Sequence, residues 1–171
     1  MTPPGVHGPK GSTRGSSQYG KQLREKQKVK RMYGIMEKPF RKYVETALKS
    51  KGNTGEALLS SLERRLDNII FRLGFAPSRS SARQIVSNRH VLVNSKKLNI
   101  PSYSVQVGDV VSLSAKATEI PEVKKVMLQE DLLIPSWLEK KANVGHLTRI
   151  PVRSDVPEPI SEQDIVEYYS R

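Results

Sequence analysis

The residues with the clearest chemical pattern in this sequence are two arginines in the stretch SRSSARQIVSNRHVLVNSKK, residues 78–97. Arg79 and Arg83 are four residues apart, so both project from one face of a helix. Guanidinium groups present planar forks of N–H donors that match phosphate oxygens. Ser78 is placed to cap this helix, whose free backbone N–H groups suit one more phosphate. The stretch therefore predicts contact with a polyanion.

Other basic and polar residues are candidates for the same surface. Some follow the expected helix, on a short strand and its turn, and others lie in the basic segment near residues 21–31 or on later helices. The remaining predicted RNA-binding residues are Lys21, Arg24, Lys26, Lys28, Lys30, Arg31, Arg41, Arg64, Arg65, Arg89, His90, Asn94, Lys96 and Lys97.

The net charge of +12 is unevenly distributed over the 171 residues. Residues 1–52 hold 13 Lys and Arg against 3 Asp and Glu, and residues 53–98 hold 8 against 3. Residues 99–171 hold 8 against 11 and are mildly acidic. A solvated lysine-rich surface is the plain interpretation, but charge concentrated in this way favours nucleic acid as the partner.

Catalytic, metal-binding and membrane functions have little support. There is no cysteine, and His7, His90 and His146 lie far apart in sequence. GNTGEALL lacks the Lys-Ser/Thr of a phosphate-binding loop. No stretch reaches the ~20 apolar residues of a membrane span, and the first residues lack a secretory apolar region. We expect a soluble intracellular protein that is not an enzyme and has no cofactor or metal site.

The first part of the chain, up to Gly74, is expected to be mainly helical. Residues 1–17 are rich in Gly, Pro and Ser and suggest an extended arm. Helices are expected from Tyr19, with a division near residues 37–38 before Pro39, and again from a cap at Thr54. An apolar stripe over residues 62–73 predicts one more helical stretch that ends at Gly74.

After Arg89 the apolar period changes to two. Strands are expected at 91–93, 98–100, 105–107 and 110–113, with a turn at 94–97. A helix over 119–130, a loop to Arg153 and a last helix capped by Ser161 complete the chain. Residues 62–114 form a helix pair with a small antiparallel sheet, and the fold class is α+β.

These residues support a resemblance to a known family. LERRLDNIIFRLGFAPSRSSARQIVSNRHVLVN, followed by KKLNIPSY and VGDVV, resembles the RNA-binding domain named after bacterial small-subunit ribosomal protein S-four. The same domain occurs in pseudouridine synthases, tyrosyl-tRNA synthetases and a heat-shock factor. The flanking motifs PPGVHG, YGKQLREKQKVKRMYG, KGNTGEALLSSLERRLDN and PISEQDIVEYYSR resemble the ribosomal protein family itself.

The resemblance implies a primary rRNA-binding protein of the small ribosomal subunit, in the cytoplasm or an organelle. In the family, the protein binds a junction in the 5′ domain of the rRNA, nucleates assembly and contributes to translational accuracy. Small-subunit protein five is an implied partner, and protein three a further one through the arm, where Lys10 and Arg14 would take part. A free homo-oligomer is not expected.

The resemblance also implies an inserted domain. The RNA-binding domain at 62–129, with its core at 62–114, would interrupt a helical body in which 19–61 pack with 130–171, after the basic arm 1–18. Compared with the family, the segment before PPGVHG is short, so we expect no zinc-dependent contact there. Ser95 also replaces the glycine of the usual Asn-Gly-Lys turn, and either that turn is strained or Asn94 takes the positive-φ conformation.

Two other functions remain as alternatives. A free RNA-binding factor would use the same small domain but would not need the YGKQLREKQKVKRMYG segment. An RNA-modifying enzyme would need a catalytic domain for which the chain lacks length. If the arginine face lies on RNA, Arg79→Ala with Arg83→Ala should weaken rRNA binding and flatten its salt dependence while the fold stays intact.

Overall fold

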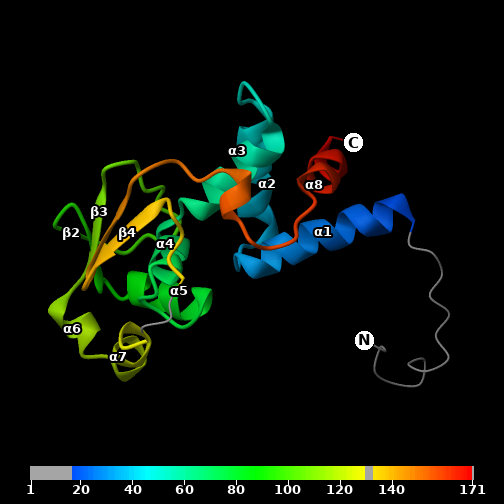
Figure 1. Cartoon of the computed structure of the whole chain (residues 1–171). Coiled ribbons are helices and arrows are strands. Elements are labelled where there is room, and N and C mark those ends of the chain that lie inside the picture. Colours follow the sequence, from blue (N-terminus) through cyan, green and yellow to red (C-terminus); the bar gives the residue numbers. More distant parts are fainter. Residues whose placement is uncertain (1–16, 130–132, 171) are drawn as a thin grey trace, which may run out of the picture.

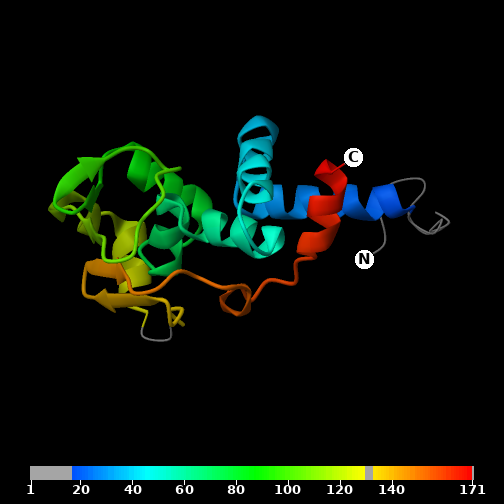
Figure 2. The same ribbon diagram turned by 90° about the horizontal axis from the view of Figure 1, so that it is seen from above.

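The computed structural model describes residues 17–129 and 133–170, which form two lobes (Figures 1 and 2). One lobe is helical, and the other packs helices against a small sheet. The chain leaves the helical lobe, builds the sheet lobe, and returns to the helical lobe with its last helix. The predicted α+β class is confirmed. Lys10, Arg14 and nearly all of the expected arm 1–18 lie outside the described residues.

The helical lobe has a compact apolar core in which the predicted stripe of the second helix takes part. Phe40 and Val44 are fully buried there beside Leu58 and Ile165. Pro39 lies in a first helical turn, as expected. The helices of this lobe are α1 (Gln18–Met32), α2 (Glu37–Leu48), α3 (Thr54–Glu63) and α8 (Glu162–Tyr169).

Two predicted helix caps are wrong in detail. Asn53, not Thr54, caps α3, because its side chain accepts hydrogen bonds from the backbone N–H groups of Gly55 and Glu56. Ser161 precedes α8, but its side chain makes no capping bond. Its backbone N–H instead donates to Glu25 on α1 at 3.3 Å, so that contact joins α8 to the neighbouring helix.

The expected continuous helix through residues 62–73 is broken at Arg65. Arg65 has extended backbone angles (φ −63°, ψ 139°), and α4 (Leu66–Arg72) begins after it. The loop that follows the sheet's first hairpin explains the break, since the backbone N–H groups of Leu66 and Asp67 donate to the carbonyls of Tyr103 and Pro101. Tertiary contact therefore overrides a helical apolar pattern here.

The next two boundaries are confirmed. Gly74 follows α4 with φ +64°, the left-handed conformation that glycine adopts without penalty. Ser78 caps α5 (Arg79–Ser87), and its side chain accepts a hydrogen bond from the backbone N–H of Ser81. The helix pair of the predicted RNA-binding unit is therefore α4 and α5, which pack closely together.

All five strands of the sheet pair antiparallel, in the order β2-β1-β3-β5-β4. Of the predicted strands, that at 105–107 is wrong, and that at 98–100 is displaced to 96–98 because the turn spans only two residues instead of 94–97. Val105 is buried, but its segment is a loop in which the Gln106 N–H donates to Asp109. The strands are β1 (Val91–Val93), β2 (Lys96–Leu98), β3 (Val110–Leu113), β4 (Leu138–Lys141) and β5 (Val144–Leu147).

The β4–β5 hairpin was expected to be a loop packed with the helical body. It instead pairs with β3 and brings Trp137, Leu138 and Leu147 into the core of the sheet lobe. Gly145 lies so close to Leu73 that a Cβ would come within 2.5 Å of its side chain. The sheet lobe therefore extends to residue 147, beyond the expected boundary at 129.

The rest of the sheet lobe and the return segment also differ from expectation. The helix expected at 119–130 is the shorter α7 (Pro121–Met127), with Pro121 in its first position, and a short helix α6 (Ala115–Thr118) that was not expected precedes it. The short 3-10 helix η1 (Arg153–Asp155) interrupts the segment that leads to α8. No helix within the described ranges has the length and apolarity needed to cross a membrane.

The hairpin between β1 and β2 provides the first testable prediction. Val93 pairs with Lys96, so Asn94 and Ser95 form a two-residue turn, and both have positive φ (49° and 67°). Asn94 therefore takes the positive-φ conformation, and Ser95 is strained by it as well, because a type I′ turn requires positive φ at both central residues. Ser95→Gly is expected to raise the free energy of unfolding by about 0.5–1 kcal/mol because it relieves this strain.

Urea unfolding would measure this change. Ser60→Gly in the middle of α3 is the control, and it should lower stability by a similar amount because a helix interior disfavours glycine. A Ser95→Gly protein that is less stable than the parent would contradict the turn assignment.

Candidate nucleic-acid interface

The predicted RNA-binding residues divide into two groups in the structure. One group is held at low exposure by carboxylates of the chain itself, and the other is exposed, with Lys28 and Arg41 each also pairing with a neighbouring carboxylate on the surface. Lys26, for example, is 6% exposed; its Nζ donates to Glu37 at 2.8 Å and lies 4.5 Å from the Tyr168 ring centroid. Lys30 pairs with the same carboxylate at 3.1 Å. Part of the positive charge of this first helix is therefore balanced by a carboxylate of the chain itself.

Arg79 and Arg83 differ most from the expectation. Arg79 donates to Asn68 at 2.8 Å and to Glu158 at 3.1 Å, and its guanidinium stacks between the rings of Tyr33 and Phe71. The acidic group expected opposite this helix face is thus supplied by the chain itself.

Arg83 is held in a similar way. It pairs with Asp67 at 2.8 Å and donates to the carbonyls of Tyr33 and Gly34. The expectation that Arg79→Ala with Arg83→Ala leaves the fold intact is accordingly corrected, because the substitutions remove contacts that join the lobes.

These contacts belong to a charged cluster at the junction of the lobes, which we call the junction cluster. Glu63, which is fully buried, accepts from Tyr33 at 2.6 Å, from Asn68 at 2.7 Å and from Arg72 at 2.8 Å. Its charged members are Glu63, Arg65, Asp67, Arg72, Arg79, Arg83 and Glu158.

The electrostatics of the junction cluster follow from this pairing. Burial alone would lower the pKa of Arg72, but its hydrogen bonds to Glu63 and Glu158 raise it. Burial alone would raise the pKa of Glu158, but Arg72 and Arg79 lower it. Arg72 and Glu158 are therefore charged at neutral pH, and Glu158 ties the return segment to α4 and α5 of the sheet lobe.

A first candidate surface remains on the outer face of α1. Lys21, Arg24, Lys28 and Arg31 recur at intervals of three and four residues, on the face opposite the buried Gln22, Lys26 and Val29. All four are exposed. We call this row the α1 face. It contains four of the six basic residues predicted for this segment. The other two, Lys26 and Lys30, pair with Glu37 instead.

A second candidate surface is a cavity of about 470 Å³ between the α1–α2 turn and the start of α5. Its lining includes three arginines and two serine hydroxyls but none of the Asp or Glu residues in the described ranges. We call it the junction cavity. Its polar lining residues are Arg31, Tyr33, Ser78, Arg79, Ser80 and Arg83.

A third candidate surface is a cavity of about 810 Å³ on the sheet lobe, formed by the end of α5, the sheet and the start of α6. We call it the sheet cavity. No carboxylate of the described residues lines it, and its basic lining residues are Arg89, His90, Lys97 and Lys116. The first three were predicted. Lys116 and the nearby Asn143 were missed, because they come from α6 and from the unexpected β4–β5 hairpin.

Arg89 is unusual within the sheet cavity. It has φ +60° at the position just after α5, where its N–H donates to the Val86 carbonyl and that of His90 to Ile85. Glycine is favoured at such a helix end. An exposed arginine there costs stability, so its side chain is expected to serve another purpose.

The other predicted residues contribute less directly. Asn94 bonds to Asp109 and Val110 and so holds the hairpin turn. Arg64 donates to Ser104 at 2.7 Å, Arg65 is buried against Asp67, and Arg41 pairs with Glu45 at 2.9 Å. Lys96 is exposed on β2 beside the turn.

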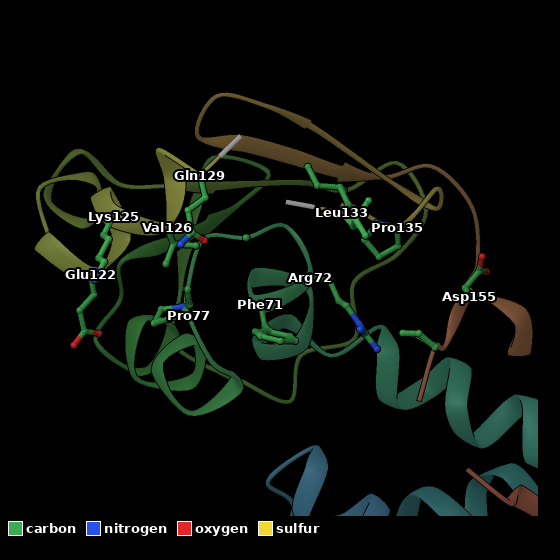
Figure 3. A pocket seen from close by; sticks show the side chains of 14 residues that line it. Phe71, Arg72, Pro77, Glu122, Lys125, Val126, Gln129, Leu133, Pro135 and Asp155 are labelled. Carbon is green, nitrogen blue, oxygen red and sulfur yellow. The ribbon is translucent and has the colours of Figure 1, made fainter. Parts of the chain in front are cut away.

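A third cavity has a different character. It measures about 820 Å³ and is bordered by Phe71, Val126, Leu133 and Pro135, with a mixture of basic and acidic residues at its edge (Figure 3). It has no excess of positive charge and holds none of the predicted RNA-binding residues. Among the described residues no group of three or more His, Asp or Glu is arranged to hold a metal ion.

Two family models match this chain, one after the other. A family model described as "Ribosomal protein S4/S9 N-terminal domain" matches residues 2–63, and one described as "S4 domain" matches residues 64–111. Together they span the helical lobe's first part, α4, α5 and most of the first three strands. The boundary between the two matches lies at the break between α3 and α4.

Curated relatives match nearly the whole chain. Small ribosomal subunit protein uS4A of Symbiobacterium thermophilum is 48% identical over 172 residues, which cover 99% of this chain and 82% of the relative. The uS4 proteins of Caldicellulosiruptor saccharolyticus and Pelobacter propionicus are each 51% identical, over 174 and 175 residues, with the same coverage. The chain therefore belongs to the uS4 family of small ribosomal subunit proteins.

Proposed function

We propose that the chain is a structural, non-catalytic component of the small ribosomal subunit and binds its rRNA directly. The observation that carries this proposal is the sheet cavity, which gathers Arg89, His90, Lys97 and Lys116 without a carboxylate among the described residues that line it. Structured RNA is contacted mostly through its backbone, and such a surface suits phosphates. The α1 face adds a second row of exposed cations on the other lobe.

The finer parts of the proposal rest on the family resemblance. They are a junction in the 5′ domain of the rRNA as the binding site, an early role in assembly, a contact with small-subunit protein five that affects accuracy, and a contact of the arm with protein three. The relatives are bacterial, which favours a ribosome of bacterial type in the cytoplasm. The exposed α1 face supports this function over a free RNA-binding factor, which has no need of that segment.

Arg89→Gly tests the sheet cavity with two readouts of opposite sign. The substitution places glycine at a left-handed position, so the free energy of unfolding should rise by about 1 kcal/mol. The loss of one phosphate contact should weaken binding to a 5′-domain rRNA fragment about tenfold and reduce the salt slope by about one.

Arg149→Gln is the matched control, because Arg149 carries the same charge but lies in neither basic cavity and pairs with Asp155. Its rRNA affinity should stay close to that of the parent. If Arg89→Gly gains stability and keeps full rRNA affinity, the sheet cavity is not an RNA-contacting surface.

A further inference from the structure

The junction cluster has an excess of positive charge. Its basic members are Arg65, Arg72, Arg79 and Arg83, and its acidic members are Glu63, Asp67 and Glu158. Each arginine has a carboxylate partner, but Asp67 and Glu158 are each shared by two arginines, so four guanidinium groups face three carboxylates and the cluster keeps one net positive charge. Charges held at low exposure are stable when they are paired, so the net positive charge indicates that an anion from outside the chain completes the set.

The net positive charge is directed toward the junction cavity. Glu63 and Asp67 are buried beneath it, whereas the Arg83 side chain is 36% exposed and lines the cavity. Arg79 uses Nε for Asn68 and one Nη2 bond for Glu158, and its Nη1 has no hydrogen-bond partner among the described residues. N–H donors of the cluster therefore remain available on the cavity side.

Arg31 strengthens the same site from the other lobe. It lies in the last turn of α1, is exposed, and lines the junction cavity without an ion pair to any described residue. Ser78 and Ser80, whose hydroxyls hydrogen-bond to each other at 2.9 Å, also line the cavity. Three guanidinium groups border a space of about 470 Å³, which has room for an RNA phosphate together with part of its nucleotide, and their N–H donors match the phosphate oxygens.

We infer that one phosphate of the bound RNA occupies the junction cavity, completes the charge of the junction cluster, and so fixes the angle between the two lobes. This inference rests on the proposed function, since the RNA supplies the phosphate. Arg31 belongs to the helical lobe and Arg79 and Arg83 to the sheet lobe, so a phosphate held by all three joins the lobes. An anion that binds only the folded, correctly oriented chain also stabilises it by mass action.

The first experiment uses inorganic phosphate as the probe. The thermal midpoint of the full chain is measured against phosphate concentration, with potassium chloride at equal ionic strength as the reference. The midpoint should rise with phosphate and level off, beyond any change that chloride causes. Arg31→Gln should remove this phosphate-specific rise, because Arg31 makes no ion pair that the fold requires. Lys42→Gln, an exposed residue of α2 outside the cavity, should keep it.

The second experiment measures the angle between the lobes. The chain has no cysteine, so Ser50→Cys on the helical lobe and Ser102→Cys on the sheet lobe allow two spin labels to be attached. The distribution of distances between the labels should narrow with phosphate and with a 5′-domain rRNA fragment. With Arg31→Gln it should stay broad in phosphate, and the rRNA affinity should fall about tenfold.

The outcomes separate this inference from the proposed function. If phosphate acts no differently from chloride, and Arg31→Gln binds the rRNA fragment as well as Lys42→Gln does, the inference is overturned while rRNA binding stands. If the unmodified chain does not bind the rRNA fragment in preference to other RNA, the proposed function itself fails. A phosphate-specific rise that Arg31→Gln removes supports an anion site in the junction cavity, and the inference as a whole also requires that the chain binds the rRNA fragment.

Discussion

Glu63→Gln is expected to lower the free energy of unfolding by about 3 kcal/mol or more, because it removes one partner of a buried ion pair. Glu63 is fully buried and accepts from Tyr33, Asn68 and Arg72. Glutamine keeps the size of the side chain but not its charge. Arg72, whose side chain is 10% exposed, would then depend on Glu158 alone for a counter-charge.

Urea unfolding measures the loss, and Glu45→Gln is the control. Glu45 is exposed on α2 and pairs with Arg41 across one helical turn, an arrangement that contributes about 0.3–0.5 kcal/mol. Equal, small losses for the two variants would show that the junction cluster does not stabilise the chain as described.

The second large effect concerns the α1 face. Neutralising Lys21, Arg24 and Lys28 together with glutamine should weaken binding to a 5′-domain rRNA fragment by ten- to a hundredfold at moderate salt. Each lost phosphate contact reduces the slope of log affinity against log salt by about 0.7–0.9, so the slope should fall by about two to three. The fold should persist, since all three side chains are exposed and, among the described residues, the only tertiary contact removed is the hydrogen bond of Lys28 to the Pro159 carbonyl.

A variant of equal charge separates local contact from the total charge of the chain. Lys38, Lys42 and Lys49 are exposed on or just after α2 and lie in none of the three candidate surfaces. Replacing these three with glutamine should change the affinity and the salt slope much less. The same loss in both triple variants would mean that the basic chain attracts RNA without a defined α1 contact.

Local signals in the sequence predicted the part of the fold that depends on neighbouring residues. Ser78 caps α5 and Gly74 ends the preceding helix, because each residue acts within one turn of its own position. Val91 and Val93 alternate as a strand with one buried face. Arg24 and Lys97, which the sequence predicted to bind RNA, are exposed in the structure, and their contact with RNA stays a prediction.

Contacts between distant residues decided the rest. Arg79 and Glu158 are 79 positions apart, so the sequence pattern showed a charged helix face without its internal partner. The break at Arg65 depends on carbonyls of the 101–103 loop. The β4–β5 hairpin has the unremarkable sequence LEKK and VGHL, and its pairing with β3 is a long-range event.

Contacts between distant residues also explain why the candidate site in the structure differs from the one predicted from the sequence. The sequence predicted one arginine face on RNA, whereas the structure divides the basic residues among an internal cluster, the α1 face and two cavities. Arg79 and Arg83 serve both the cluster and the junction cavity. Lys116 joined the sheet cavity only because α6 follows β3 directly.

Specific rRNA binding is the central claim, and a titration at two salt concentrations tests it most directly. The purified chain is titrated with a 5′-domain junction fragment of small-subunit rRNA, with tRNA, and with a plain duplex of similar length. At low salt a chain of net charge +12 should bind all three through counter-ion release. At high salt the complex with the junction fragment alone should survive. If all three complexes dissociate together, the basic surfaces are generic, and a specific role in the small subunit is contradicted.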